Sequence, residues 1–171
     1  MNGDDSTFLQ LFGKSRLPQE SGTGSEDNED SSDLTGPDFS APYKPAGASR
    51  GKGLTSLWVY FNAEERKQHK RRKRQFQFRN LDDDDADSGF LDDGTGFSLV
   101  FSGQKRHRLI VKGRGGPKLE EIYDRITLHR TPWIRSLDPG RDFGADGEAV
   151  ITSIRIELLQ DEEIQGFTQL K

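Results

Sequence analysis

The fold prediction starts from residues 96–112, which read GFSLVFSGQKRHRLIVK. Apolar residues occupy every second position over 96–101, and Leu109 and Val111 repeat this spacing within 106–112, which is the pattern of a strand with one buried face. Between them, residues 102–105 are small or polar and favour a turn. The segment therefore predicts an antiparallel hairpin. The side chains predicted to share its buried face are Phe97, Leu99, Phe101, Leu109 and Val111.

On the C-terminal side of this hairpin the apolar residues take the spacing of a helix, and Pro117 stands where helices often begin. This pattern predicts a helix over 118–130 with one face packed on the sheet. A last strand is predicted over 150–159. Its inward side chains are expected to be Ile154, Ile156 and Leu158.

On the N-terminal side, residues 54–61 are aromatic and β-branched and predict a strand. Asn62 follows with Glu65 three positions later, which is the pattern of a helix capping box. The residues after it predict a short helix over 63–74, with a long hairpin loop as the alternative. Residues 75–79 alternate and predict another short strand.

Composition divides the 171-residue chain near residue 50. Leu, Ile, Val and Phe make up 7 of the first 49 residues but 32 of the remaining 122, and the first part has nine Asp/Glu against three Lys/Arg. A segment so poor in apolar residues buries too little surface to fold. We predict a disordered acidic arm over 1–50, an α+β domain over 51–162 and a C-terminal tail over 163–171. The domain is expected to be a small, mostly antiparallel sheet of about five strands covered by one main helix, 118–130.

The densest positive charge lies in residues 66–74, called the basic run below, where seven of nine residues are Lys or Arg. Such a cluster attracts nucleic acid because each phosphate contact releases a condensed counterion. Phe76 and Phe78 would add stacking faces for bases. The candidate nucleic-acid-binding residues are Arg66, Lys67, Lys70, Arg71, Arg72, Lys73, Arg74, Phe76 and Phe78.

A second charge cluster lies in residues 82–94, called the acidic loop below, which carry seven Asp. The favoured interpretation is that the basic run is solvated or neutralised by the acidic loop; the alternatives are a free basic run that binds nucleic acid or an acidic protein. A calcium loop of the EF-hand type would begin at Asp83. That register places Ser88 where Gly is required and Gly94 where Glu is required, so no metal site is predicted.

Two weaker sites remain. The apolar residues Phe8, Leu9, Leu11 and Phe12 stand out in the acidic arm, and they either form a docking segment for a partner or pack on the chain's own domain. The turn at 112–118 leads into the predicted helix, where Arg114 and Lys118 would contact a bound anion. A tight turn that needs glycine freedom is the favoured interpretation there.

The remaining composition argues against catalysis. There is no cysteine, the three histidines are scattered, no GxSxG is present and the carboxylates lie mostly in exposed runs. We therefore expect no enzyme, no cofactor and no metal.

No apolar run reaches the ~18 residues of a membrane helix, and the acidic start is unlike a signal peptide. The leading hypothesis is a non-enzymatic interaction or adaptor protein of unknown partner, cytoplasmic, or nuclear in a eukaryote. The alternative is a nucleic-acid-binding protein that uses the basic run.

Overall fold

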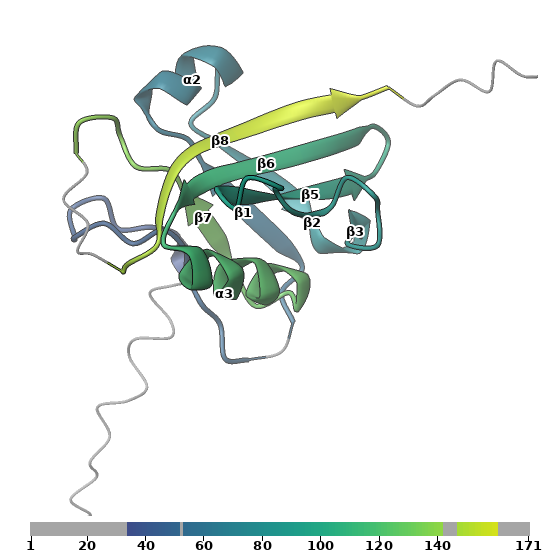
Figure 1. The fold of residues 1–171 in the computed structure, drawn as a ribbon, viewed down its shortest axis with the longest axis horizontal. Coiled ribbons are helices and arrows are strands. Elements are labelled where there is room, and N and C mark those ends of the chain that lie inside the picture. Colours follow the sequence, from purple (N-terminus) through teal and green to yellow (C-terminus); the bar gives the residue numbers. More distant parts are fainter. Residues whose placement is uncertain (1–33, 52, 142–146, 161–171) are drawn as a thin grey trace, which may run out of the picture.

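The computed structural model describes residues 34–51, 53–141 and 147–160. Within these ranges the chain is an α+β fold with several antiparallel strands and two α-helices (Figure 1). The predicted fold class is confirmed, whereas the prediction of one main helix is corrected to two. The docking segment predicted at Phe8, Leu9, Leu11 and Phe12 and the tail predicted at 163–171 lie outside the described residues and stay predictions.

The larger of two sheets contains the predicted hairpin. Its strands run in the order β3 (Leu81–Asp82), β5 (Gly96–Ser102), β6 (Arg106–Arg114) and β8 (Val150–Leu159), and β4 (Gly89–Phe90) also pairs with β5. All these pairs are antiparallel. In the hairpin Phe97 lies opposite Val111 and Leu99 opposite Leu109, so the predicted buried face is confirmed.

The smaller sheet was not predicted as a separate sheet. It has the order β2 (Lys73–Gln77), β1 (Ser56–Tyr60) and β7 (Trp133–Arg135), with β1 antiparallel to β2 and parallel to β7. The strand β7 has only three residues and directly follows Pro132, so it is too short to show an alternating pattern in the sequence. The prediction of one sheet is corrected to two.

The two helices differ from their predicted bounds. The first, α2 (Ala63–His69), begins with the predicted capping box of Asn62 and Glu65 and ends at Lys70, whose φ of 52° is left-handed. The chain then enters β2, so the predicted helix 63–74 was too long. The second, α3 (Gly116–Thr127), begins earlier and ends earlier than the predicted 118–130. The helical spacing of Leu119, Ile122, Tyr123 and Ile126 predicts one inward face. Leu119, Ile122 and Ile126 are buried and Tyr123 is half-buried.

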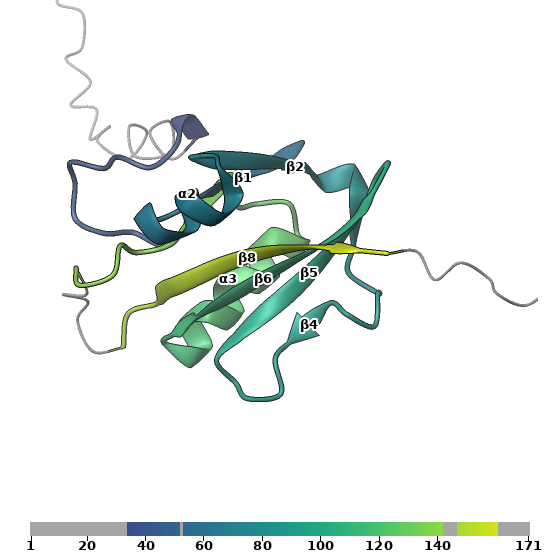
Figure 2. The ribbon, with the colours of Figure 1, turned by 90° about the horizontal axis from the view of Figure 1, so that it is seen from above.

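A single hydrophobic core joins both sheets and α3. Figure 2 shows β1 and β2 on one side of the strands β5, β6 and β8. Side chains of β1 and β2 meet those of β5 in this core; the ring centroids of Phe76 and Phe101, for example, are 4.6 Å apart. Leu158 was predicted to point into the core but is 55% exposed. It pairs with His107 near the tip of the hairpin, beyond the reach of the core.

Residues 38–49, called the strap below, lie against β7 although the sequence placed them in the arm. Ala46 forms an antiparallel bridge with Ile134, and the Gly47 N–H donates to the Trp133 carbonyl oxygen at 2.9 Å. The Arg135 N–H donates to the Pro45 carbonyl oxygen at 2.8 Å. Contacts with the domain therefore begin before residue 51, where the sequence predicted the domain to start.

Candidate nucleic-acid interface

The basic run lies on α2, on the turn after it and on β2. Lys67, Lys70, Arg71, Arg72 and Lys73 are exposed. Arg66 and Arg74 are half-buried, because Arg66 Nε donates to the Phe61 carbonyl oxygen at 2.9 Å and an Arg74 Nη atom lies 2.8 Å from His107 Nε2. The run thus presents a band of cationic side chains anchored at both ends.

Two aromatic rings lie beside this band on the outer face of the small sheet. Lys73 Nζ is 4.4 Å from the ring centroid of Trp58 and 5.6 Å from that of Tyr60. Trp58 and Tyr60 are half-buried because they alternate along β1 with Leu57 and Val59, which are in the core. The strand prediction for 54–61 contained this alternation, but the sequence analysis did not assign the outward rings to the site.

The predicted stacking role of Phe76 and Phe78 is wrong, because both rings belong to the core. Phe76 is 5% exposed and Phe78 is 2% exposed. In the β1–β2 register Phe76 lies opposite Leu57, so it takes the inward face of β2. Phe78 follows in the 3₁₀ turn η1 (Phe78–Asn80) and stacks on His129 with ring centroids 4.6 Å apart. Neither ring can stack on a base while the domain is folded.

The acidic loop does not pair with the basic run. Its Asp side chains pair instead with β6: Asp85 with Arg106, Asp87 with Arg108 at 3.6 Å, and Asp93 with Lys112 at 3.7 Å. Within the part of the chain that the structure describes, no ion pair joins residues 66–74 to residues 82–94. The interpretation that the acidic loop neutralises the basic run is therefore wrong, whereas the interpretation of a solvated basic run stays a prediction.

The acidic loop is held in place by more than charge. It contains β3 and β4, and the Ser98 hydroxyl donates to the Asp87 carbonyl oxygen at 2.5 Å. The backbone N–H of Asp87 and the Arg106 guanidinium both bond the Asp85 carboxylate and hold its pKa below the ordinary value. An Asp already bonded in this way is a poor ligand for a cation. Across the described ranges, no three His, Asp or Glu side chains converge to hold a metal ion.

The turn predicted as a weak anion site joins β6 to α3. Lys118 Nζ lies 3.8 Å from a carboxylate oxygen of Glu148. Gly115 has a φ of 98°, and a Cβ there would lie 2.7 Å from the Glu148 carbonyl oxygen. Glycine is needed at this position for both its conformation and its close contact. Nothing here tests anion binding by Arg114 and Lys118, which stays a prediction.

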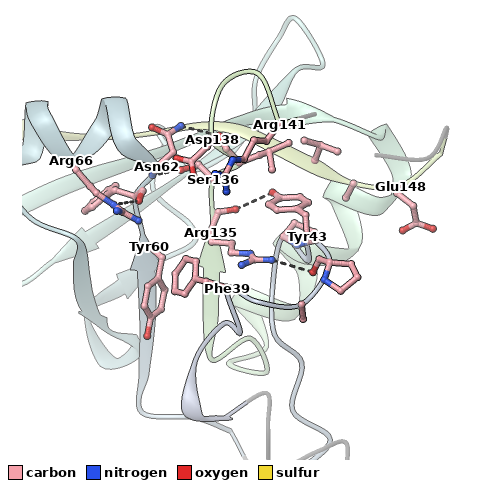
Figure 3. A pocket seen from close by; sticks show the side chains of 17 residues that line it. Phe39, Tyr43, Tyr60, Asn62, Arg66, Arg135, Ser136, Asp138, Arg141 and Glu148 are labelled. Carbon is pink, nitrogen blue, oxygen red and sulfur yellow. Dashed lines mark hydrogen bonds between the residues drawn. The ribbon is translucent and has the colours of Figure 1, made fainter. Parts of the chain in front are cut away.

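A pocket of about 580 Å³ opens next to the basic run. The strap, the end of β1, α2 and the segments 135–141 and 148–150 line it (Figure 3). This lining includes Arg66, which belongs to the cationic band, and Tyr60, whose ring lies beside that band. The sequence analysis missed the pocket because it placed the strap in the disordered arm.

Arg135 builds one wall of this pocket. Its guanidinium donates to the carbonyl oxygens of Lys44 at 2.8 Å and of Asp38 and Pro42 at 3.3 Å. The guanidinium carbon also lies 5.4 Å from the Phe39 ring centroid and 5.1 Å from that of Tyr43. One buried side chain therefore fixes the strap and its two rings.

Glu65 is a buried carboxylate, 6% exposed, that is bonded to two residues of the pocket lining, Asn62 and Ser136. It accepts hydrogen bonds from the backbone N–H groups of Asn62 and Ile154 and from the Ser136 hydroxyl. Burial raises the pKa of Glu65, although these hydrogen bonds oppose the shift. The sequence analysis assigned it only the capping role, because nothing local in the sequence shows that β8 packs on α2.

Comparison with known proteins gave no significant match to a family model, to a curated protein or to a solved structure. Among the helices that the structure describes, none combines the length and apolar composition of a membrane span. Evidence for a function therefore comes from the geometry and the charges of the surface.

Proposed function

We propose that this chain binds single-stranded nucleic acid along the basic run and the neighbouring rings of Trp58 and Tyr60. The observation that carries the proposal is the pairing of the acidic loop with β6: among the residues that the structure describes, the acidic loop forms no ion pair with the basic run. An exposed cationic band of this kind binds phosphates and releases counterions.

The aromatic rings favour a single strand over a duplex. Bases of a single strand are open for stacking, and stacking on an aromatic side chain contributes about 1–3 kcal/mol per base. Lys73 Nζ lies over the face of the Trp58 ring, so a base that stacks there would displace the ammonium, which could then contact the phosphate of that base. Stacking accepts any base, so binding without strong sequence preference is expected.

A salt titration tests the proposal. Fluorescence anisotropy of labelled oligo(dT) and oligo(U) would be measured between 50 and 300 mM salt, and affinity is expected to fall steeply with salt. In the variant Arg71→Ala/Arg72→Ala the slope of log K against log salt should become shallower by about 1.4, since each lost phosphate contact on a single strand removes roughly 0.7.

The matched control is Arg50→Ala/Arg130→Ala, which removes the same charge from exposed positions outside the basic run, the pocket lining and the turn at 112–118. Its slope should equal that of the wild type. Absence of binding to either oligonucleotide at 50 mM salt would overturn the proposal, and so would equal slopes for the two double variants.

Trp58 offers a second readout. The chain has two tryptophans, and Trp133 is buried. Quenching of tryptophan fluorescence by an oligonucleotide should therefore come from Trp58 and disappear in Trp58→Leu. Quenching that survives this substitution would remove Trp58 from the interface.

The interaction-protein hypothesis from the sequence remains a separate proposal. It predicts that removal of residues 1–17, which contain Phe8 to Phe12, weakens capture of a partner protein and leaves oligonucleotide binding unchanged. Unchanged capture of the partner protein after this deletion would contradict the hypothesis.

A further inference from the structure

The pocket beside the basic run is continuous with the proposed strand-binding surface. Arg66 belongs to the basic run and lines the pocket, and Tyr60 lies under Lys73 and lines it as well. A strand that follows the basic run and the outer rings of β1 would therefore pass over the mouth of the pocket.

The charges at the pocket favour an anion. Arg66 and Arg141 line it, and neither forms an ion pair with a carboxylate among the described residues. The two carboxylates of the lining are occupied elsewhere: Asp138 Oδ1 accepts the Ala63 N–H at 2.8 Å, and Glu148 faces Lys118. Arg66 uses its Nε atom on the Phe61 carbonyl oxygen, so its Nη atoms and the Arg141 guanidinium are the groups that would contact a ligand.

The apolar part of the lining suits a planar group. Phe39 is 62% exposed, and its ring meets the edge of Tyr60 with centroids 6.0 Å apart. Arg135 holds Phe39 from behind through the strap carbonyls and a cation–π contact. This aromatic wall is therefore in place before any ligand arrives, which lowers the entropic cost of binding.

Figure 3 shows Arg66 and Arg141 on opposite sides of Asn62 and Ser136. A nucleotide unit inside a strand has a phosphate on each side of its sugar, so two cations on opposite sides of one site could each contact one phosphate. The volume of about 580 Å³ is also within the range of roughly 300–1,000 Å³ typical of small-molecule sites.

We propose, as a step that rests on the proposed function, that this pocket takes one nucleotide unit of the bound strand. The base lies against Phe39 and Tyr60, and the flanking phosphates contact Arg66 and Arg141. The pocket thus fixes the position of the strand, whereas the basic run supplies the sequence-independent attraction.

Isothermal titration of the full chain with adenosine 3′,5′-bisphosphate and adenosine 5′-monophosphate tests the inference. The bisphosphate should bind one per chain, roughly tenfold tighter than the monophosphate, because it reaches both guanidinium groups. Arg141→Ala should abolish that difference and Phe39→Ala should weaken both ligands by about fivefold or more. Arg130→Ala, an exposed cation outside the pocket, should change neither affinity.

Oligo(U) binding by the same preparations separates the two proposals. If oligo(U) binds through the basic run but the bisphosphate does not bind, the pocket inference falls and the surface proposal stands. If neither ligand binds, both fall. Bisphosphate binding without oligo(U) binding also overturns both as stated, since the occupant would then be a free nucleotide. Equal bisphosphate affinity in the wild type and Arg141→Ala overturns the assignment of the second phosphate.

Phe39 and Arg141 are exposed, so thermal denaturation should show that both variants fold as the wild type does.

Discussion

Arg135 Nε donates a hydrogen bond to the Lys44 carbonyl oxygen at 2.8 Å. Through this contact a residue of β7 holds a segment that lies 91 positions earlier in the chain. The same guanidinium bonds two further strap carbonyls, and among the described residues no carboxylate forms an ion pair with it. Burial lowers the pKa of Arg135, yet the carbonyl dipoles and the two rings compensate the charge.

Replacing Arg135 should release the strap. Arg135→Met keeps the apolar length of the side chain but leaves three carbonyl oxygens without their donor. We expect the free energy of unfolding to fall by about 2–4 kcal/mol. Limited proteolysis should then cut within residues 38–45 faster than in the wild type. Urea denaturation and cleavage-site mapping check this, with Arg130→Ala as a control. An uncut strap in Arg135→Met would contradict it.

Glu65 should be the carboxylate on which stability depends most. Glu65→Ala removes the acceptor shared by α2, the Ser136 hydroxyl and β8, leaving buried donors unpaired. We expect a loss of about 2–4 kcal/mol in the free energy of unfolding, measured by urea denaturation. The neighbouring Glu64→Ala is the control, because Glu64 is exposed and its ion-pair partner within the described ranges is Lys67 alone, at 3.4 Å. It should change stability by less than about 0.5 kcal/mol.

The raised pKa of Glu65 also predicts a pH dependence. Because burial disfavours the ionised form in the folded state, this group stabilises the fold most when it is protonated, and the contribution is lost as pH rises from 4.5 through the raised pKa. The free energy of unfolding of the wild type, relative to Glu65→Gln, should therefore increase as pH is lowered from 7 towards 4.5. A pH-independent difference would show that Glu65 keeps its ordinary pKa in the folded protein.

Three features could be predicted because each depends on local periodicity or on neighbours within a few residues. They are the hairpin at 96–112, the capping box at Asn62 and the buried face of α3. The second sheet and the pocket could not be predicted in this way, because they depend on contacts between residues far apart in the sequence, such as Ala46 with Ile134. Counting charges also gave a wrong prediction. The basic run and the acidic loop each carry seven charges of opposite sign, which suggested that they pair, whereas the strand order places Asp85 next to Arg106.

Neutralising the acidic loop tests that strand order directly. Asp85→Asn/Asp87→Asn removes the partners of Arg106 and Arg108 but none of the basic run. Oligonucleotide affinity at 150 mM salt should rise less than about threefold, through net charge alone. If the acidic loop instead covered the basic run, the same variant would bind tenfold or more tightly and with a steeper salt dependence.

Gly113 sits at a β-bulge where β6 and β8 approach closely. The register between these strands shifts between Lys112 and Gly113, and a Cβ at Gly113 would lie 2.1 Å from the Val150 carbonyl oxygen. Because that oxygen belongs to backbone in the sheet, it cannot move aside without breaking the pairing.

Gly113→Ala should therefore lower the free energy of unfolding by more than about 3 kcal/mol, or prevent folding. Gly116→Ala, three residues later, is the matched control, because a Cβ there meets nothing within 4 Å and the residue begins α3. It should leave stability unchanged or raise it by up to about 1 kcal/mol. Thermal and urea denaturation of the two variants measure the contrast, and equal stabilities would mean that β6 and β8 are further apart at the bulge than described.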